Sequence, residues 1–406
     1  MNRFIERLGD EVEISWKKEG YVREVFSEIA YQVLKKSGVS EQLTMEEVLL
    51  WLQKTKDLPE QLSLDQSFGS PPITLYHHSH FLIDVYFWVA PEMSIHSHGF
   101  QGAFAVLEGN SLHCRYQFPI RENFKDDILI GNLHLEEAVL LRKGEVHEIP
   151  MGTDLIHQVW HLSSPTVSLA IRTPKKERLQ YNYFKPHLSL REQFPIPPLQ
   201  IKRSDALRML YRTKHPRKER FLKELLLEGD PLGALWILLK YFKDTNDLKG
   251  IQKILPDIPK LQRWIPSLLE SFKYLYETTV DWAAFKGEEE KLFLALLCSV
   301  DKKDQIEHFI QRYYPERNPE QHLMEWLTRL AKRKGLGFRL NETALEVLAL
   351  LLRGCEEEEI CRELSTTYDV ENSIRFLQEI RTLCKQLRSL PLFKPLLSSL
   401  PQEISL

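Results

Sequence analysis

The chain has 406 residues, 43% of them hydrophobic and 27% charged, which is the balance of a soluble globular protein with two or three domains. Its formal net charge of −3 excludes a bulk electrostatic attraction to nucleic acid or to an anionic membrane. The five cysteines lack paired metal-binding spacing, which favours a reduced, cytoplasmic protein without disulfides. The N-terminal stretch MNRFIERLGDEVEISWKKEG has no apolar segment of the signal-peptide kind, and we expect no membrane association.

Residues 1–69 are expected to be helical and to pack on the domain that follows. The segments FIERL, YVREVFSEIAYQVLKKSG and TMEEVLLWLQKTK space their apolar residues by three and four, as an amphipathic helix does. Gly38 is a predicted helix stop, and Thr44 with Glu47 forms a predicted capping box.

Residues 70–187 change to short runs typical of strands. The runs are ITLYHHSH, FLIDVYFWVA, GAFAVLEG, SLHCRYQFPI, EEAVLLRKG, EVHEIP, LIHQVWHL and TVSLAIRT. Close spacing with turns between them predicts an antiparallel sandwich or barrel. Residues 188–201 are rich in proline and are predicted to be a linker.

Residues 202–406 are predicted to be entirely helical. They open on the basic segment KRSDALRMLYRTKHPRKERFLKEL, which indicates a solvated helix face or, alternatively, a contact with a phosphate-rich partner. Three stretches that start at Leu235, Leu292 and Leu345 share a layout of apolar helix, charged turn and amphipathic helix. This pattern predicts stacked helical modules that bind a protein partner, or it is chance similarity between amphipathic helices.

The residues richest in chemistry lie between Pro91 and Gly109. An apolar run, FLIDVYFWV, comes first and is followed by His96-Ser97-His98. Residues two apart in a strand point to the same face, so the two imidazoles are expected on one wall of the barrel. Two imidazoles form half of a metal site, and His157 on a later strand is the candidate for the rest.

The surrounding motifs resemble those of the cupin superfamily. The first motif is a His-x-His strand that ends in glycine, here from His96 to Gly109, and the second is a G…PxG…H strand, here Gly144 to His157. The resemblance implies an α+β fold: a cupin-type β-barrel (a double-stranded β-helix) with N-terminal helices, followed by an all-α domain.

One departure narrows the resemblance. Cupins commonly place a metal-binding glutamate four residues after the second histidine, where this chain has Gly102. This is similar to the cysteine dioxygenase-like, or thiol dioxygenase, branch, which holds iron with three histidines. The segments LRKGEVHEIPMGTDLIHQV and SSPTVSLAIRTP also resemble that branch. It implies His96, His98 and His157 as ligands of Fe(II), with Zn or Ni as alternatives; a cupin that has lost its metal is the remaining alternative.

Three further residues are implied in catalysis. His161 stands where cupins often have asparagine and is expected to orient the site. Ser168 matches the serine of the family's Ser-x-His-x-Tyr network, whose histidine and tyrosine are replaced here by Ala170 and Arg172. Arg172 is expected either to bind an anionic substrate group or to form a structural ion pair.

Several other residues carry weaker expectations. The histidines of HHSH (77–80) are expected at an edge strand or loop, where metal binding is the lesser alternative. His113 and Tyr116 are predicted to line the barrel interior. Gln101 is predicted to be a surface residue.

These features leave three hypotheses open. The first is an enzyme: a mononuclear non-haem iron cupin that oxygenates a small thiol or related acidic substrate with O2. The second is a ligand-sensing or interaction protein whose helical half binds a partner protein. The third is a cupin metalloenzyme of other chemistry, because one barrel fold hosts many reactions.

Overall fold

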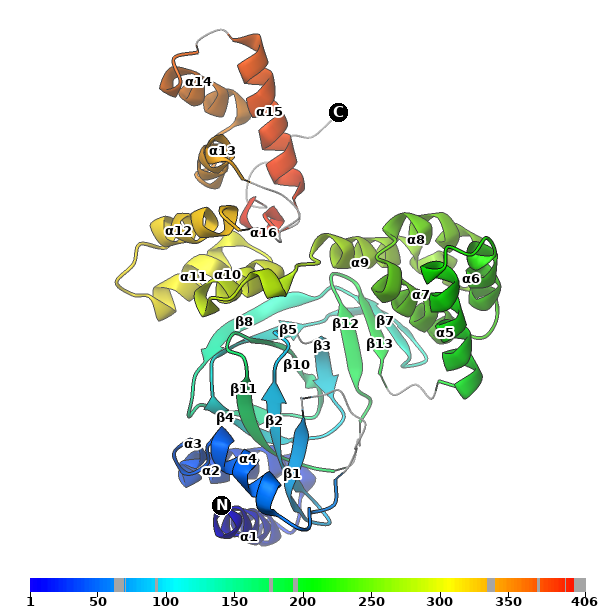
Figure 1. The fold of residues 1–406 in the computed structure, drawn as a ribbon, viewed down its shortest axis with the longest axis vertical. Helices are drawn as coiled ribbons and strands as arrows, with labels where there is room; N and C mark the ends of the chain where they lie inside the picture. Colours follow the sequence, from blue (N-terminus) through cyan, green and yellow to red (C-terminus); the bar gives the residue numbers. More distant parts are fainter. Residues whose placement is uncertain are drawn as a thin grey trace.

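The fold is layered, with two β-sheets in the middle and helices on both outer faces (Figure 1). The computed structural model describes residues 1–61, 69, 71–91, 94–174, 178–192, 196–333, 340–370, 373–390 and 392–397. None of the helices among these residues combines the length and the apolar composition that a bilayer crossing requires.

The two sheets are antiparallel and form the predicted cupin-type barrel. One sheet has the strand order β1-β2-β11-β4-β9, and the other has the order β6-β7-β13-β12-β3-β10-β5-β8. The strands are β1 (Pro72–His77), β2 (Leu82–Trp88), β3 (Ile95–His98), β4 (Gly102–Glu108), β5 (Ser111–Gln117), β6 (Ile120–Phe124), β7 (Ile128–Gly131), β8 (His134–Leu141), β9 (Val146–Ile149), β10 (Gly152–His161), β11 (Thr166–Arg172), β12 (Tyr181–Phe184) and β13 (Leu188–Arg191). The expected fold class is confirmed, including its helical segments on either side of the barrel.

The structure differs from the predicted linker at residues 188–201. Its first four residues form β13, which is paired with β7 and β12, and helix α5 already begins at Pro198. Leu188 and Leu190 are buried, so this segment belongs to the sheet despite the prolines that follow. Strands β6, β7 and β12 were also missed, because each is only four or five residues long.

The N-terminal helices cover the outer face of the five-stranded sheet. They are α1 (Asn2–Lys18), η1 (Arg23–Val25), α2 (Phe26–Ser37), α3 (Val39–Gln42) and α4 (Met45–Lys54). Gly38 ends α2 in the left-handed conformation, and Thr44 with Glu47 makes the predicted capping box of α4. The helices share one core with the outward residues of β2, β4 and β11, among them Val85 and Leu169.

The second half of the chain is helical and lies against the eight-stranded sheet. Its elements are α5 (Pro198–Arg212), α6 (Lys218–Leu227), α7 (Pro231–Thr245), α8 (Leu248–Ile254), η2 (Leu255–Asp257), η3 (Pro259–Trp264), α9 (Ile265–Glu277), η4 (Trp282–Ala284), α10 (Glu288–Ser299), α11 (Lys303–Tyr313), α12 (Pro319–Ala331), α13 (Glu342–Leu352), α14 (Glu357–Thr367), α15 (Ile374–Ser389) and α16 (Lys394–Leu397). The three stretches of similar layout begin in α7, α10 and α13. Their relation as repeats stays a prediction.

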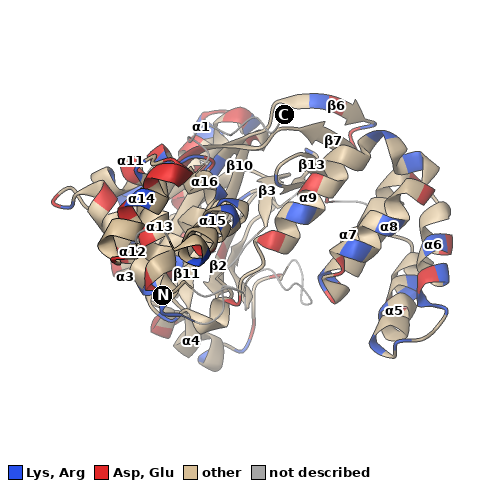
Figure 2. Cartoon of the chain, turned by 90° about the horizontal axis from the view of Figure 1, so that it is seen from above, with Lys and Arg blue, Asp and Glu red and all other residues tan. Residues whose placement is uncertain are grey.

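The basic opening of this half is balanced by acidic side chains. Figure 2 shows blue and red residues beside each other on α5 and α6. Ion pairs join Arg203 to Glu228 and Lys223 to Asp257, and Arg208 bonds two aspartates. These ion pairs balance part of the positive charge of the segment, and the choice between a solvated face and a phosphate-rich partner stays a prediction.

The hydrophobic cores join the sheet and the helices. One core contains residues of β5 and β10 together with residues of α10 to α16. Another contains residues of β7 and β13 together with residues of α5 to α9. The apolar outer face of the eight-stranded sheet is thus buried by the helical half of the chain.

Candidate metal centre

A cavity of about 80 Å³ lies between the two sheets. Its wall follows the two-residue period of the strands, because alternate residues of each strand face it. Strand β10 contributes His157, Val159 and His161, while β11 contributes every second residue from Thr166 to Arg172. The aromatic part of the wall consists of Tyr86, Trp88, Phe100 and Phe104, together with the imidazoles.

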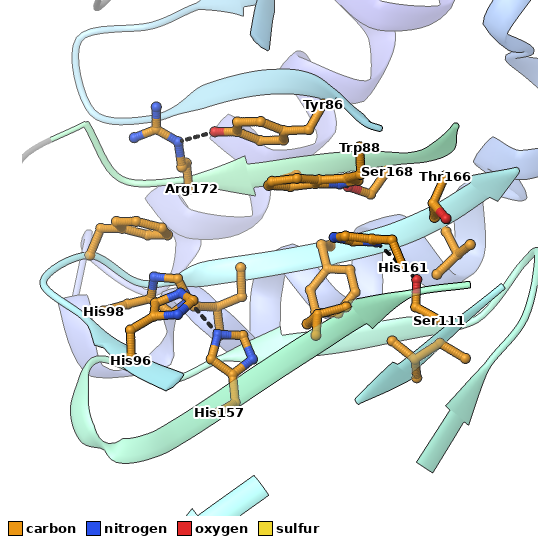
Figure 3. A pocket seen from close by; sticks show the side chains of 17 residues that line it. Tyr86, Trp88, His96, His98, Ser111, His157, His161, Thr166, Ser168 and Arg172 are labelled. Atoms are coloured by element: carbon orange, nitrogen blue, oxygen red, sulfur yellow. Dashed lines mark hydrogen bonds between the residues drawn. The ribbon is translucent and has the colours of Figure 1, made fainter. Parts of the chain in front are cut away.

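Three histidines converge at one end of this cavity (Figure 3). His96 and His98 come from β3, and His157 comes from the adjacent strand β10, where it is the register partner of His96. One nitrogen of each ring lies within 4.8 Å of one nitrogen of the other two. The three side chains are buried, with exposed fractions of 4–5%. The structure therefore brings together the three residues that the motifs predicted.

Hydrogen bonds orient two of these rings. The Nδ1 atom of His96 lies 2.8 Å from the carbonyl oxygen of Ser94, to which it donates. The Nδ1 atom of His157 lies 2.8 Å from Nε2 of His113, and its Nε2 atom lies 2.8 Å from Nε2 of His98. A bond at Nδ1 leaves Nε2 as the atom that faces the centre of the cluster, as in many metal sites.

Burial disfavours the charged form of His96, His113 and His157. Burial lowers the pKa of His96, partly offset by its bond to Ser94. Burial, and then the neighbouring His96 and His98, hold the pKa of His157 well below its usual value. Burial lowers the pKa of His113 to about 3, with a smaller contribution from His147. Neutral imidazoles have lone pairs to share, so this donor set fits a divalent transition metal.

Gly102 shows why no carboxylate completes the set. It lies on β4 between β11 and β9, paired with Arg172 and Ile149. A Cβ atom at this position would lie 1.9 Å from the carbonyl oxygen of Ile171. No side chain fits there without a shift of the backbone, so the glutamate found in many cupins is sterically excluded from this barrel.

Arg172 lines the cavity but is already paired. Its Nε atom lies 2.7 Å from Oδ2 of Asp84, which is 2% exposed, and 3.0 Å from the hydroxyl of Tyr86. Burial, followed by the charge of Asp84, raises the pKa of Tyr86, so its hydroxyl stays protonated and donates to Asp84. The positive charge of Arg172 is therefore balanced inside the protein.

Phe100 lies between this ion pair and the histidines. Its ring centroid is 4.5 Å from that of His98 and 5.2 Å from Cζ of Arg172. The ring contacts both groups and gives the guanidinium an aromatic face to stack on.

His161 and Ser168 lie apart from the three histidines, at the other end of the cavity (Figure 3). The His161 ring stacks on Trp88 at 4.8 Å with an angle of 9° between the planes, and its Nδ1 atom lies 3.1 Å from the hydroxyl of Ser111. The Ser168 hydroxyl accepts a 2.8 Å hydrogen bond from Nε1 of Trp88. Burial lowers the pKa of His161 to about 3, so it is neutral.

The weaker expectations have mixed outcomes. His113 faces the interior as predicted, but Tyr116 does not: it lies three residues further along β5 and so points to the opposite face, where it donates to Gln158 beside the helical half. Gln101 is buried, not at the surface, because its side-chain amide donates to the backbone of Arg23.

The HHSH histidines separate in the structure. His77 lies 3.7 Å from Glu60, whereas His78 lies 3.7 Å from Glu13 and its ring lies 5.4 Å from that of His80. Nitrogens of His78 and His80 and a carboxylate oxygen of Glu13 lie within 4.8 Å of one another at the partly exposed junction of α1 and the β1–β2 turn.

Sequence reasoning missed two residues of the site. Asp84 stands inside the apolar run FLIDVYFWV, and an acid in such a run requires a buried partner. That signal could have indicated a nearby cation, which the structure shows to be Arg172 on the neighbouring strand β11. The role of His113 depends on the pairing of β5 with β10, which no local pattern reveals.

Comparison with known proteins finds similarity to parts of the chain. The family Coenzyme PQQ synthesis protein D (PqqD) matches residues 319–391, which include α12 to α15. No curated protein matches the chain. A cupin-2 domain containing protein from Shewanella frigidimarina is 15% identical; the match covers 34% of this chain and 99% of that one, with a TM-score of 0.20.

Two enzymes are among the similar solved structures. A hydroquinone 1,2-dioxygenase is 15% identical, and the match covers 25% of this chain and 62% of that one with a TM-score of 0.19. An oxalate oxidase in complex with glycolate is 12% identical, with 48% of this chain and 81% of that one covered and a TM-score of 0.22.

Proposed function

We propose that the barrel is a mononuclear metal-dependent oxygenase that acts on a small organic substrate, with Fe(II) held by His96, His98 and His157. The observation that carries the proposal is the convergence of three buried imidazoles in a cavity. Three neutral ligands leave the full charge of a divalent ion in place, and the bound ion would supply open positions for O2 and for a substrate thiolate.

The protein side chains have distinct roles in this proposal. His113 accepts a hydrogen bond from Nδ1 of His157 and thereby holds Nε2 of that ring toward the cluster. Phe100 and Phe104 line the cavity and exclude water from its interior. Ser168 holds Trp88 in place, and the paired Arg172 forms part of the wall beside Phe100.

A small thiol is the proposed substrate class. Addition of both atoms of O2 to sulfur, RSH + O2 → RSO2H, balances without an outside reductant. The cavity volume of about 80 Å³ admits only a small molecule. The resemblance of the motifs to thiol dioxygenases supports this choice, while the pairing of Arg172 with Asp84 weighs against a carboxylate as the anchoring group.

The first experiment is elemental analysis of protein purified without added metal. We expect about one iron per chain, and loss of that iron in His98→Ala. His134→Ala, which removes an exposed histidine of β8, is the matched control and should keep it. Equal iron content in His98→Ala and the control would remove the proposal. An O2 electrode with a panel of thiols then tests the reaction; bound zinc or nickel without O2 uptake would favour a hydrolase or isomerase.

A second candidate function concerns the helical half. Residues 319–391 match the family Coenzyme PQQ synthesis protein D, whereas the comparisons that match the barrel are with other proteins. We propose that it binds a partner protein. Crosslinking of the full chain in cell extract, with mapping of the crosslinked lysines, should place a partner on α12 to α15; crosslinks confined to other elements would contradict this.

A further inference from the structure

The end of the cavity opposite the three histidines contains a polar atom that the protein leaves unsatisfied. Nε2 of His161 is buried and has no hydrogen-bond partner among the described residues. Its ring lines the cavity under Trp88, with the Nδ1 side turned to Ser111 (Figure 3). A buried polar atom without a partner is costly, so such an atom in a cavity wall indicates a ligand group.

The neighbouring polar groups are all bonded to the protein. The Ser168 hydroxyl accepts from Trp88, and the Ser111 hydroxyl contacts His161. The Thr166 hydroxyl lies 3.3 Å from the carbonyl oxygens of Asn110 and Ser163. Among the polar atoms named here, His161 Nε2 is the one that is buried without any hydrogen-bond partner among the described residues.

The described side chains that line the cavity leave no charge unbalanced. Arg172 is the one permanently charged residue among the described residues that line it, and its partner is the buried carboxylate of Asp84. At the His161 end, away from the metal, a substrate carboxylate would be a buried anion with no cationic side chain free to pair with it, which is unfavourable. The lining therefore disfavours an acidic group on the substrate at this end and favours a neutral polar group.

The distance between the metal-binding end of the cavity and the His161 end sets the length of a ligand that contacts both. His157 and His161 lie four residues apart on β10, so their Cα atoms are separated by about 13 Å along the strand. The wall between them is formed by Val159 of the same strand and by the ring of Phe104. A short aliphatic segment fits this apolar middle.

We infer that the substrate is a small, uncharged thiol with a hydroxyl or similar neutral group at its far end, and that His161 Nε2 selects it by a hydrogen bond to that group. This rests on the proposed function, because the sulfur end requires the metal. A hydroxyl both donates and accepts, so it satisfies Nε2 in either tautomer of the ring. His161 is then a specificity-determining residue rather than part of the metal site.

The test compares three series of thiols with two to four methylene groups: mercaptoalcohols, mercaptocarboxylic acids and unsubstituted alkanethiols. Binding to the Co(II)-loaded full chain is followed by the thiolate-to-metal charge-transfer absorption, a readout independent of turnover. We expect one mercaptoalcohol to bind about fivefold tighter than its alkanethiol, the worth of one neutral hydrogen bond, and the acids to bind weakest.

Substitutions at His161 test whether its Nε2 atom causes the preference for mercaptoalcohols. His161→Phe keeps a ring on Trp88 but lacks Nε2, and should make alcohol and alkanethiol bind equally. His161→Gln should restore part of the preference. Thr166→Val removes a hydroxyl that is bonded to the backbone and should keep the full preference.

The outcomes separate the two proposals. Absence of the charge-transfer band with every thiol would overturn the proposed function and this inference together. A band with all thiols but tightest binding of the acids, or equal binding of alcohol and alkanethiol, would overturn the inference and leave the metal site standing. An alcohol preference that persists in His161→Phe would also overturn it.

Discussion

At the scale of single residues, the barrel interior contains five buried histidines. His96, His98, His113, His157 and His161 are all buried, with exposed fractions of 3–5%. Each must lose its proton or stay neutral for the chain to fold, because the cavity offers no acidic partner among the described lining residues. This requirement connects the stability of the protein to pH.

The pH dependence is testable at His161. Its pKa in the folded protein is about 3, whereas an unfolded imidazole titrates at about 6.5, so the unfolded chain takes up the proton first as the pH falls. The free energy of unfolding should therefore fall below pH 6.5 by about 1.4 kcal/mol per pH unit for this group, until the pH approaches 3. Urea unfolding of metal-free protein at pH 7.5 and 5.0 measures the loss.

His161→Phe is the comparison for this measurement. It removes the group that titrates, so its loss of stability between the two pH values should be smaller than that of the unmodified protein by about 2 kcal/mol. Parallel losses in the two proteins would show that His161 is protonated in the folded state.

His113 supplies a second prediction at this scale. His113→Phe keeps a ring in place but removes the acceptor for Nδ1 of His157. We expect the affinity for metal to fall by about 10–100-fold, as when a supporting partner of a ligand histidine is lost. Competition with a chelator of known affinity measures this. His147→Phe, beside His113 in the same aromatic cluster but without a bond to a ligand, should have little effect.

At the scale of the elements, Gly102 at the start of β4 is a position where the close approach of β11 excludes any side chain. Gly102→Ala places a Cβ atom against the backbone of β11, the strand that carries Ser168 and Arg172. We expect a loss of unfolding free energy of about 3 kcal/mol or more, measured by urea unfolding. In Gly287→Ala the nearest atoms lie 3.6 Å or more away, so this control meets no clash and should lose only the smaller free energy of replacing the N-cap glycine of α10.

How far the sequence predicts these elements depends on how local their signals are. The alternation of His96 and His98, and the glycines around the two motifs, lie within single segments, and the structure places these residues as expected. The bond from His157 to His113 and the ion pair of Asp84 with Arg172 depend on strand register across the sheet. Short strands such as β12 contain too few residues for a period to be recognised.

At the scale of the whole molecule, the barrel and the helical half share their cores. Residues of β5 and β10 pack with those of α10 to α16, and residues of β7 and β13 pack with those of α5 to α9. We expect one cooperative thermal transition of the metal-free full chain by calorimetry, in which the calorimetric and van't Hoff enthalpies agree. Two separate transitions would show that the two halves fold independently.

One ion pair at this interface gives a sharper prediction. The side chain of Lys185 is 5% exposed, and its ammonium group lies 3.1 Å from Oδ1 of Asp301. The other carboxylate oxygen of Asp301, Oδ2, accepts a hydrogen bond from the backbone N–H of Leu135. Asp301→Ala leaves that ammonium group buried without its carboxylate and should cost about 2–3 kcal/mol, allowing for the partial exposure of Asp301. Chemical unfolding measures this, with Asp304→Ala on the exposed face of α11 as a control that should change little.

Strand β10 presents opposite sides to two different environments. Its inward residues are His157 and His161, while Trp160 between them donates a hydrogen bond to Ser299 of α10 and contacts Trp282. A displacement of α10 must therefore move the strand that carries these imidazoles. Thermodynamic coupling is reciprocal, so an ion that rigidifies β10 would also stabilise the packing of α10 against this strand. Metal binding in the barrel and the packing of the helical half would then be coupled equilibria.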